Sequence, residues 1–233
     1  MKMKCVLFNI NDTLYDSSLQ TSTARMNAIR AMIETGLPTD IETAYRVLQD
    51  IVKEHGPDYP KHFDELLKQL GLRWEPRVIA SGVIAYRETS AAYLKPYPDT
   101  VPTLLKLRDS GYKLGVVSEG IAVKQWQKLV QLGVQHIFHF VIISEEMGLK
   151  TLDQSLFKVA LKKLDAKPEE SIFVGSRLEP DIMCANSVGV ISVRIRRGEH
   201  RVERPERTEA TPKYEINNLS EILNIIKQIE DEK

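Results

Sequence analysis

Short apolar segments rich in β-branched residues recur along the chain and are separated by longer segments with helical periodicity. Five of them read KCVLFNI (residues 4–10), KLGVVS (113–118), FVIIS (140–144), SIFVG (171–175) and VISVRI (190–195). Each has the length of a buried strand and lacks the polar alternation of a half-exposed strand. A weaker strand-like segment, KYEINN, follows at 213–218. The pattern predicts the buried strands of a parallel sheet.

Amphipathic segments at 100–111, 121–134 and 155–165 fill the gaps between these strands, and a terminal one spans 219–230. The first of them ends on Gly111, and the second has Gly133 near its end, as is typical of helix C-termini. Helices that alternate with buried strands indicate a doubly wound, Rossmann-like α/β fold.

One stretch breaks the alternation. Between the first strand and the proline-containing KPYPD (95–99), the sequence shows helical periodicity over four segments and no convincing strand. We therefore expect two domains: an α/β core made of residues 1–16 and 94–233, and an inserted α-helical domain over 17–93.

Composition excludes some classes of partner. The 233 residues include 32 Lys and Arg against 32 Asp and Glu, so no broad positive field favours nucleic acid or an anionic membrane. No apolar run reaches the roughly 18–20 residues that span a bilayer, and the N-terminal run is too short for a signal peptide. Cys5 and Cys184 lack metal-type spacing. We interpret them as reduced core thiols and expect a cytoplasmic protein.

Polar side chains gather where the predicted strands end. The first strand is followed by Asn9, Asn11, Asp12 and Thr13, and the second by Ser118, Glu119 and Gly120. The third leads to Lys150 and the fourth to GSRLEPD (175–181). Ligands of parallel α/β sheets bind outside the carboxyl ends of the strands, so we expect these groups to meet at one edge.

This arrangement resembles the haloacid dehalogenase (HAD) superfamily, most of whose members are Mg²⁺-dependent phosphatases. Four motifs follow the family order: Asn9-Ile10-Asn11-Asp12-Thr13-Leu14 in place of Asp-x-Asp-x-Thr-Leu, then Ser118, Lys150, and Gly175-Ser176 with the later Asp181. The helical insert after the first motif resembles the family's cap domain. One such motif is weak evidence, but four in order, with the insert, are specific.

The resemblance implies a role for each position. Position 9 would hold the aspartate that attacks phosphorus, position 11 the general acid and base, and Lys150 a catalytic cation. The metal would take oxygens from side chain 9, main-chain carbonyl 11 and side chain 176, with Asp181 in an outer role.

Three of these positions depart from the family. Asn9 and Asn11 are neutral amides, so neither can supply an anionic nucleophile or a titratable proton near neutral pH. Ser176 replaces a carboxylate ligand, so we expect no metal here, although active relatives would bind Mg²⁺. Asp12 is not expected to substitute, because a shift of one position in an extended chain turns the side chain to the other side. Glu119 is not expected to substitute either. The sequence thus predicts a phosphatase-like protein that is inactive or strongly impaired, a pseudoenzyme.

The phosphate-binding groups are retained. Ser118, the backbone around Glu119 and Gly120, and Lys150 suit a tetrahedral anion. We therefore expect a small phosphorylated metabolite or inorganic phosphate as ligand, and a protein partner is a further possibility.

Two alternatives stay open. Taken singly, each motif also fits an ordinary turn, helix cap or solvated lysine. As a whole, the chain also fits an active HAD phosphatase on sugar or triose phosphates, or an altered form of one.

Overall fold

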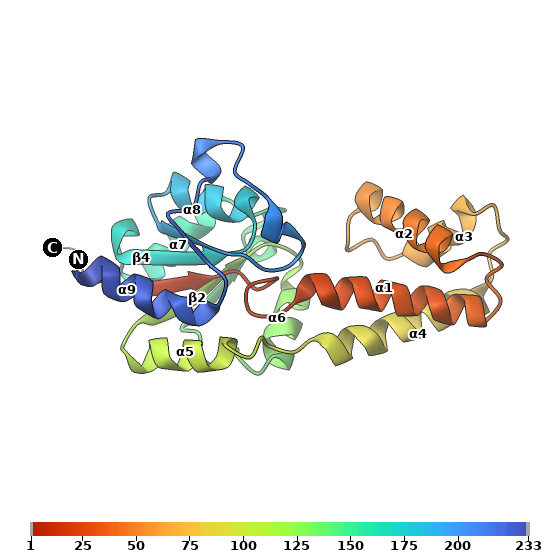
Figure 1. The fold of residues 1–233 in the computed structure, drawn as a ribbon, viewed down its shortest axis with the longest axis horizontal. Helices are drawn as coiled ribbons and strands as arrows, with labels where there is room; N and C mark the ends of the chain where they lie inside the picture. Colours follow the sequence, from red (N-terminus) through yellow and green to blue (C-terminus); the bar gives the residue numbers. More distant parts are fainter. Residues whose placement is uncertain (1, 232–233) are drawn as a thin grey trace. The chain divides into compact units, whose positions relative to one another are not determined.

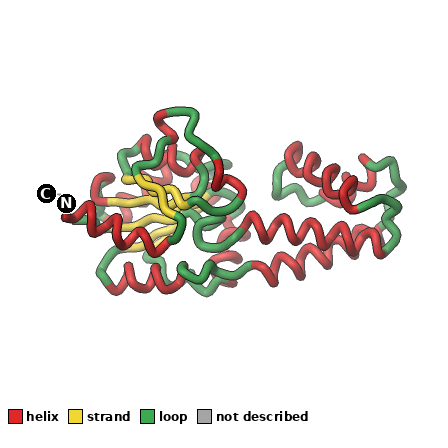
Figure 2. Tube along the Cα trace, viewed as in Figure 1, coloured by secondary structure: helices red, strands yellow, loops and turns green. Residues whose placement is uncertain are grey.

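A computed structural model describes residues 2–231, and within them six parallel strands form one sheet (Figures 1 and 2). The strands are β1 (Cys5–Phe8), β2 (Lys113–Ser118), β3 (Phe140–Ile143), β4 (Ser171–Gly175), β5 (Ile191–Ile195) and β6 (Tyr214–Ile216). Their order across the sheet is β3-β2-β1-β4-β5-β6. The predicted doubly wound α/β class is confirmed, and each predicted strand is present within two residues of its expected bounds.

Helices connect the strands. The longer ones are α5 (Thr100–Asp109), α6 (Ala122–Gln131), α7 (Gln154–Leu164), α8 (Met183–Ser187) and α9 (Ile222–Asp231). Short helical turns are η1 (Ser144–Met147), η2 (Pro168–Glu170), η3 (Leu178–Ile182), η4 (Glu199–Val202), η5 (Thr208–Ala210) and η6 (Leu219–Glu221). Of these, η3 is a π-helical turn, and it carries the fourth motif.

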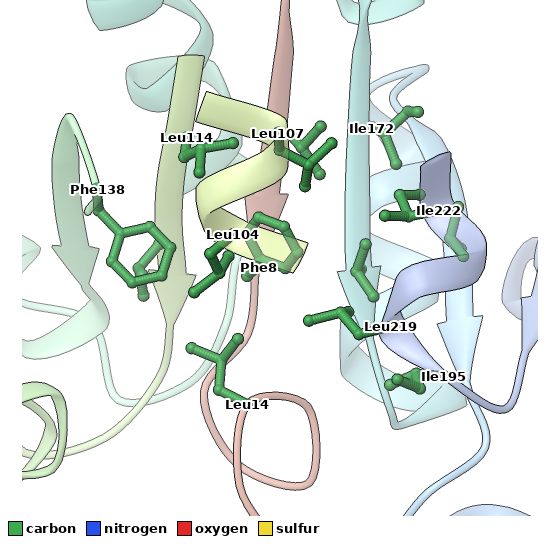
Figure 3. Packing of buried hydrophobic residues seen from close by; sticks show 14 of the residues in the cluster. Phe8, Leu14, Leu104, Leu107, Leu114, Phe138, Ile172, Ile195, Leu219 and Ile222 are labelled. Atoms are coloured by element: carbon green, nitrogen blue, oxygen red, sulfur yellow. The ribbon is translucent and has the colours of Figure 1, made fainter. Parts of the chain in front are cut away.

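Both faces of the sheet are covered, which explains the unbroken apolar character of the strands. On one face, Phe8 belongs to the cluster that contains Leu104 of α5 and Ile222 of α9 (Figure 3). On the other face, Leu7 belongs to the cluster that contains Phe157 of α7. Burying one such side chain contributes about 1.5–3 kcal/mol, so these two layers fix the position of β1.

The register brings three strand ends to the same edge. Phe8 of β1 pairs with Val116 of β2 on one side and with Val174 of β4 on the other. Because all three strands are parallel, the residues that follow them lie at one edge of the sheet. This places Asn9 and Ser118 close together by backbone geometry alone.

The chain divides into two compact units. One combines the residues up to Ser18 with those from Leu94 onward, and the other is Leu19–Tyr93. Helices α1 (Ser17–Glu34), α2 (Ile41–His55), α3 (His62–Gln69) and α4 (Pro76–Tyr93) account for the second unit, which contains no strand. Its own apolar core includes Ile29, Met32, Leu48, Leu66 and Val78.

The charged segment 196–212 is mostly exposed, as its composition suggests, but one arginine anchors it. Arg197 donates to the main-chain oxygen of Thr13 at 3.1 Å and to the Asp99 carboxylate at 2.5 Å, and it stacks on the Tyr97 ring. These contacts hold the turn that follows β1. Within residues 2–231, no helix has the combination of length and apolarity needed to cross a bilayer.

Candidate functional site

Four buried polar side chains meet at the carboxyl ends of the central strands: Asn9 after β1, Ser118 at the end of β2, Ser176 after β4 and Asp181 in η3. The backbone amide of Asn9 donates to Val174 at 2.9 Å, which extends the β1–β4 ladder into the site. Buried polar groups need partners, and here they find them in one another.

The carboxamide of Asn9 makes three hydrogen bonds. Its Oδ1 accepts from the backbone amide of Ile10 at 2.7 Å and from the Ser118 hydroxyl at 2.8 Å. Its Nδ2 donates to Asp181 Oδ2 at 2.9 Å. The partners fix the orientation of the amide, because an ionised carboxylate only accepts and a backbone N–H only donates. Asn9 therefore faces Asp181 with an N–H group.

Asn11 is half-buried and has two sets of contacts. Its side-chain Oδ1 accepts from Tyr15 Oη at 3.1 Å and from Lys128 Nζ at 2.9 Å. Its main-chain oxygen accepts from Thr13 Oγ1 at 3.2 Å and, more weakly, from Ser176 Oγ at 3.4 Å. The side chain thus lies next to a cation, and the carbonyl next to a hydroxyl.

Asp181 is fully buried, and both of its oxygens have partners. Oδ1 accepts from Arg177 Nη2 at 2.7 Å. Oδ2 accepts from Asn9 Nδ2 at 2.9 Å. It also accepts from the backbone amides of Ser176 and Arg177, both at 3.2 Å. The same guanidinium reaches Glu119 with Nη1 at 2.6 Å. Arg177 therefore joins the ends of β2 and β4 through two carboxylates.

The charges of Arg177, Asp181 and Glu119 stabilise one another. Burial lowers the pKa of the Arg177 guanidinium, but the neighbouring carboxylates of Asp181 and Glu119 raise it by more, and the net shift is upward. The guanidinium therefore stays charged. Its planar fork suits two carboxylates at once, a geometry that a lysine could not reproduce.

The residues present do not fit a magnesium ion. Mg²⁺ needs a near-octahedral set of oxygens that usually includes one or two carboxylates. Asn9 presents N–H to Asp181, and the Asn11 carbonyl and Ser176 hydroxyl bond to each other. Among residues 2–231, no group of three or more His, Cys, Asp or Glu side chains could hold a metal. The donor set is that of a site closed by internal hydrogen bonds.

The backbone after β2 is partly engaged within the protein. The amide of Gly120 donates to Ser144 Oγ at 3.1 Å, and the amide of Ala122, the first residue of α6, donates to Glu145 Oε2 at 2.7 Å. A phosphate would have to compete with these two side chains for the same N–H groups. The predicted binding role of Ser118, Glu119 and Gly120 is untested.

Gln125 organises the start of α6. Gly120 has a φ of +115°, where any other residue would be strained, and a Cβ atom there would lie 2.7 Å from Gln125 Nε2 and would displace the end of that side chain. Gln125 donates from Nε2 to the main-chain oxygen of Glu119 at 2.9 Å and accepts from Lys128 at 3.2 Å. This glutamine therefore connects the loop after β2 to the lysine that contacts Asn11.

The structure places Lys150 on the surface, in the loop between η1 and α7. The ammonium that hydrogen-bonds within the cluster is that of Lys128 in α6. The catalytic and phosphate-binding role that the family motif assigns to Lys150 remains a prediction.

The Asp12 side chain is directed away from Asn9 and Asn11, but the cause is not the alternation of side chains along an extended chain. Its φ is +48°, a left-handed turn rather than extended chain. Its carboxylate accepts from the backbone amide of Ser18 at 2.9 Å and from the Ser18 hydroxyl at 2.6 Å. Gly198 packs so closely against Asp12 that a Cβ atom at 198 would overlap it.

Sequence reasoning missed Arg177, Gln125 and Lys128. Arg177 carried a usable signal, because it is a charged residue directly after a buried strand and one position beyond Ser176. Lys128 carried no such signal. Lys124 and Lys128 both lie on the helix that follows Ser118, and the sequence does not distinguish between them.

Comparison with known proteins gives a consistent result. The family model described as haloacid dehalogenase-like hydrolase matches residues 3–189. The chain is 49% identical over 229 residues to the glyceraldehyde 3-phosphate phosphatase of Methanopyrus kandleri, covering 97% of this chain and 98% of that protein. It is 41% identical over 228 residues to the glyceraldehyde 3-phosphate phosphatase of Methanocaldococcus jannaschii, covering 97% and 98%.

Among solved structures, the chain is similar to an HAD phosphatase from Thermococcus onnurineus, with a TM-score of 0.67 and 27% identity over 96% of this chain and 98% of that one. The family model, the full-length relatives and the shared fold all support the superfamily that the motif order indicated. This chain belongs to the haloacid dehalogenase-like hydrolase family.

Proposed function

We propose that this protein binds a small phosphate ester of the triose phosphate class at the edge formed by β1, β2 and β4, and that it hydrolyses the ester slowly or not at all. The ligand class is supported by the two relatives described above, both named as glyceraldehyde 3-phosphate phosphatases and both matched over nearly their whole length.

The contact between Asn9 and Asp181 supports the proposal that hydrolysis is slow or absent. The attacking atom of a phosphatase of this family would be a carboxylate oxygen at position 9. Here the group nearest Asp181 is an amide N–H, at 2.9 Å, and the amide oxygen accepts from Ser118 and Ile10. A carboxamide oxygen is neutral and delocalised, so it is a poor nucleophile towards phosphorus.

The residues at positions 11 and 176 also lower the expected rate of hydrolysis. The amide of Asn11 has no proton to give to a leaving oxygen near neutral pH. With no carboxylate at 9 or 176 to hold Mg²⁺, the charge that builds up on the transferred phosphoryl group also lacks its usual stabilisation.

A second candidate is an active phosphatase of triose phosphates, and the relatives support it more directly than they support a binding protein. It requires a nucleophile and a cation other than the family's own. Water activated by Glu119 would be the nearest option, but that carboxylate already accepts from Arg177 and from the amide of Leu152.

One experiment separates the two. Phosphate release from glyceraldehyde 3-phosphate would be measured with Mg²⁺ for the unaltered chain and for the triple variant Asn9→Asp, Asn11→Asp, Ser176→Asp. We expect the triple variant to exceed the unaltered chain by about a thousandfold or more, in line with the cost of losing a nucleophile.

The matched control is Ser118→Ala in the unaltered chain, because residual release that survives this change comes from a contaminating enzyme. Ser118-dependent turnover by the unaltered chain at about 1 s⁻¹ or faster, ordinary for enzymes, would select the active candidate and reject the binding one.

The helical unit Leu19–Tyr93 is proposed to be the cap domain that selects the ligand. Its position after the first motif supports this, and exchange of this unit with that of a relative should alter ligand preference. A cytoplasmic location is proposed from the two cysteines, Cys5 and Cys184, which are both free thiols.

A further inference from the structure

The carboxylate of Glu119 joins loops from three parts of the sheet edge. Glu119 directly follows β2, and its Oε1 accepts from Nη1 of Arg177, in the turn after β4, at 2.6 Å. Its Oε2 accepts from the backbone amide of Leu152, in the loop between η1 and α7, at 2.9 Å. Each oxygen meets an N–H donor, so only a side chain with two acceptor oxygens makes both contacts.

The Lys150 segment, residues 149–152, is held at both ends by hydrogen bonds. At its start, the amide of Leu149 donates to the first main-chain oxygen of η1 at 2.9 Å. At its end, the Leu152 amide donates to Glu119, and the Leu152 carbonyl accepts from the Cys184 thiol at 3.5 Å. The segment contains no proline, so no ring restricts its backbone dihedral angles. Its shape therefore depends on these anchoring contacts.

Glu119 is itself fixed in position. Its main-chain oxygen accepts from Gln125 Nε2 at 2.9 Å. The guanidinium that binds its carboxylate also donates to Oδ1 of the fully buried Asp181 at 2.7 Å. Because Glu119 directly follows Ser118 in the chain, one residue connects the Ser118 hydroxyl, the buried ion pair and the Lys150 segment.

We propose that Glu119 is a positioning residue of the proposed phosphate site, and that it holds the Lys150 segment near Ser118 through the Leu152 amide. This inference rests on the proposed function and on the phosphate-binding role predicted for Lys150. The Glu119 side chain acts through the loop and makes no contact with the ligand. Its role is thus separate from that predicted for the backbone after Ser118.

The test is titration calorimetry with inorganic phosphate in EDTA, on the unaltered chain, Glu119→Gln, Lys150→Met and the double variant. Glutamine keeps the size of the side chain but has one acceptor oxygen for the two donors. Glu170→Gln is the matched control. The Glu170 carboxylate also accepts from a backbone amide, that of Lys167 at 3.0 Å, and pairs with a cation, Lys4 at 2.9 Å, but it lies at the opposite end of β4.

We expect Lys150→Met to weaken phosphate binding about tenfold, as the loss of a charge-assisted hydrogen bond implies, and Glu119→Gln to weaken it about fivefold. In the Lys150→Met background, Glu119→Gln should change the affinity by about twofold or less, because its effect passes through Lys150. Glu170→Gln should leave the affinity unchanged. Thermal melting of each variant shows whether a change in binding comes from loss of the fold.

Three results would overturn the inference and leave the proposed function intact. Unchanged affinity in Glu119→Gln, with only a lower melting temperature, would make the role of Glu119 purely structural. Equal weakening with and without Lys150 would show that Glu119 does not act through that lysine. Tighter binding in Glu119→Gln would show that its charge mainly repels the anion.

Failure of the proposed function has a different signature in the same titrations. If the unaltered chain bound no phosphate, the proposed function and this inference would fall together. The two failures are therefore distinguishable.

Discussion

The two sides of the polar cluster differ in how deeply the charged residue at the centre of each is buried. On the Asp181 side, comprising Asn9, Ser176, Arg177 and Asp181, every group described above has a partner within the protein, and the aspartate is fully buried. On the Lys128 side, comprising Asn11, Gln125 and Lys128, the asparagine and the lysine are only half-buried.

This difference in burial bears on the function that we propose. By the resemblance to the family, the Asp181 side would correspond to the metal-binding part of its site, and here its groups hydrogen-bond to one another and to the Asn11 carbonyl. By the resemblance to the family, the Lys128 side would correspond to the part nearest the leaving group, and there Lys128 donates to Asn11 at 2.9 Å. The loss of metal binding and the retention of anion binding that we propose are therefore compatible in one small site.

The largest effect is expected from Asp181→Ala. This change leaves the Arg177 guanidinium with one carboxylate and removes the acceptor for Asn9 and two backbone amides. Breaking a buried ion pair from one side costs about 3–5 kcal/mol; because Arg177 is partly exposed, we expect about 3 kcal/mol from urea unfolding. Asp109→Ala, at an exposed position, is the control. A loss below about 1 kcal/mol would show that the Asp181 side is not held as described.

A smaller effect is expected from Asn9→Asp, which would place two carboxylate oxygens at the 2.9 Å contact with Asp181. Repulsion raises the pKa of one carboxyl in the folded state above its unfolded value of about 3.9. The folded state then binds more protons than the unfolded state, so stability is full below about pH 4 and falls as the pH rises through the raised pKa.

For Asn9→Asp we expect a loss of about 2 kcal/mol at pH 8 relative to the unaltered chain, shrinking at pH 4. Urea unfolding at the two pH values measures it, and Asn224→Asp in α9 is the control for the added charge. Added Mg²⁺ should recover part of the stability lost in Asn9→Asp and should have no such effect on Asn224→Asp. A variant equally stable at both pH values would mean that Asn9 and Asp181 are not in contact.

The smallest effect is expected from Ser176→Ala. The Ser176 hydroxyl reaches the Asn11 carbonyl at 3.4 Å, which is long for an O–H···O hydrogen bond. We expect a change of about 0.5 kcal/mol or less in the free energy of unfolding, with anion binding unchanged, because this residue is on the Asp181 side. A loss of anion binding would show that the two sides are coupled.

Much of the core could be predicted from the sequence, because its strands are buried on both faces. Residues 4–10 read as a strand since Cys5 and Leu7 pack on one face and Val6 and Phe8 on the other. The turn after β1 was harder. Asp12 was expected to follow the alternation of an extended chain, whereas it adopts a left-handed conformation that its hydrogen bonds to Ser18 stabilise.

The side-chain network was less accessible to sequence reasoning. Motif order indicated that Asn9, Ser118 and Asp181 would meet, and the structure brings these three into direct contact. Motif order gave no means of choosing Lys128 over Lys150 as the lysine that hydrogen-bonds within the cluster. That choice depends on the angle of α6 and on the loop between η1 and α7, and neither follows from local propensity.

By itself, the sequence determined the sheet, the helical insert and the neutral side chains at positions 9, 11 and 176, because burial patterns and residue chemistry are local properties of the chain. Only the tertiary structure decided which groups those side chains contact. Hydrogen bonds between residues as distant as Asn9 and Asp181 depend on strand register and helix packing, which bring together positions that no local pattern relates.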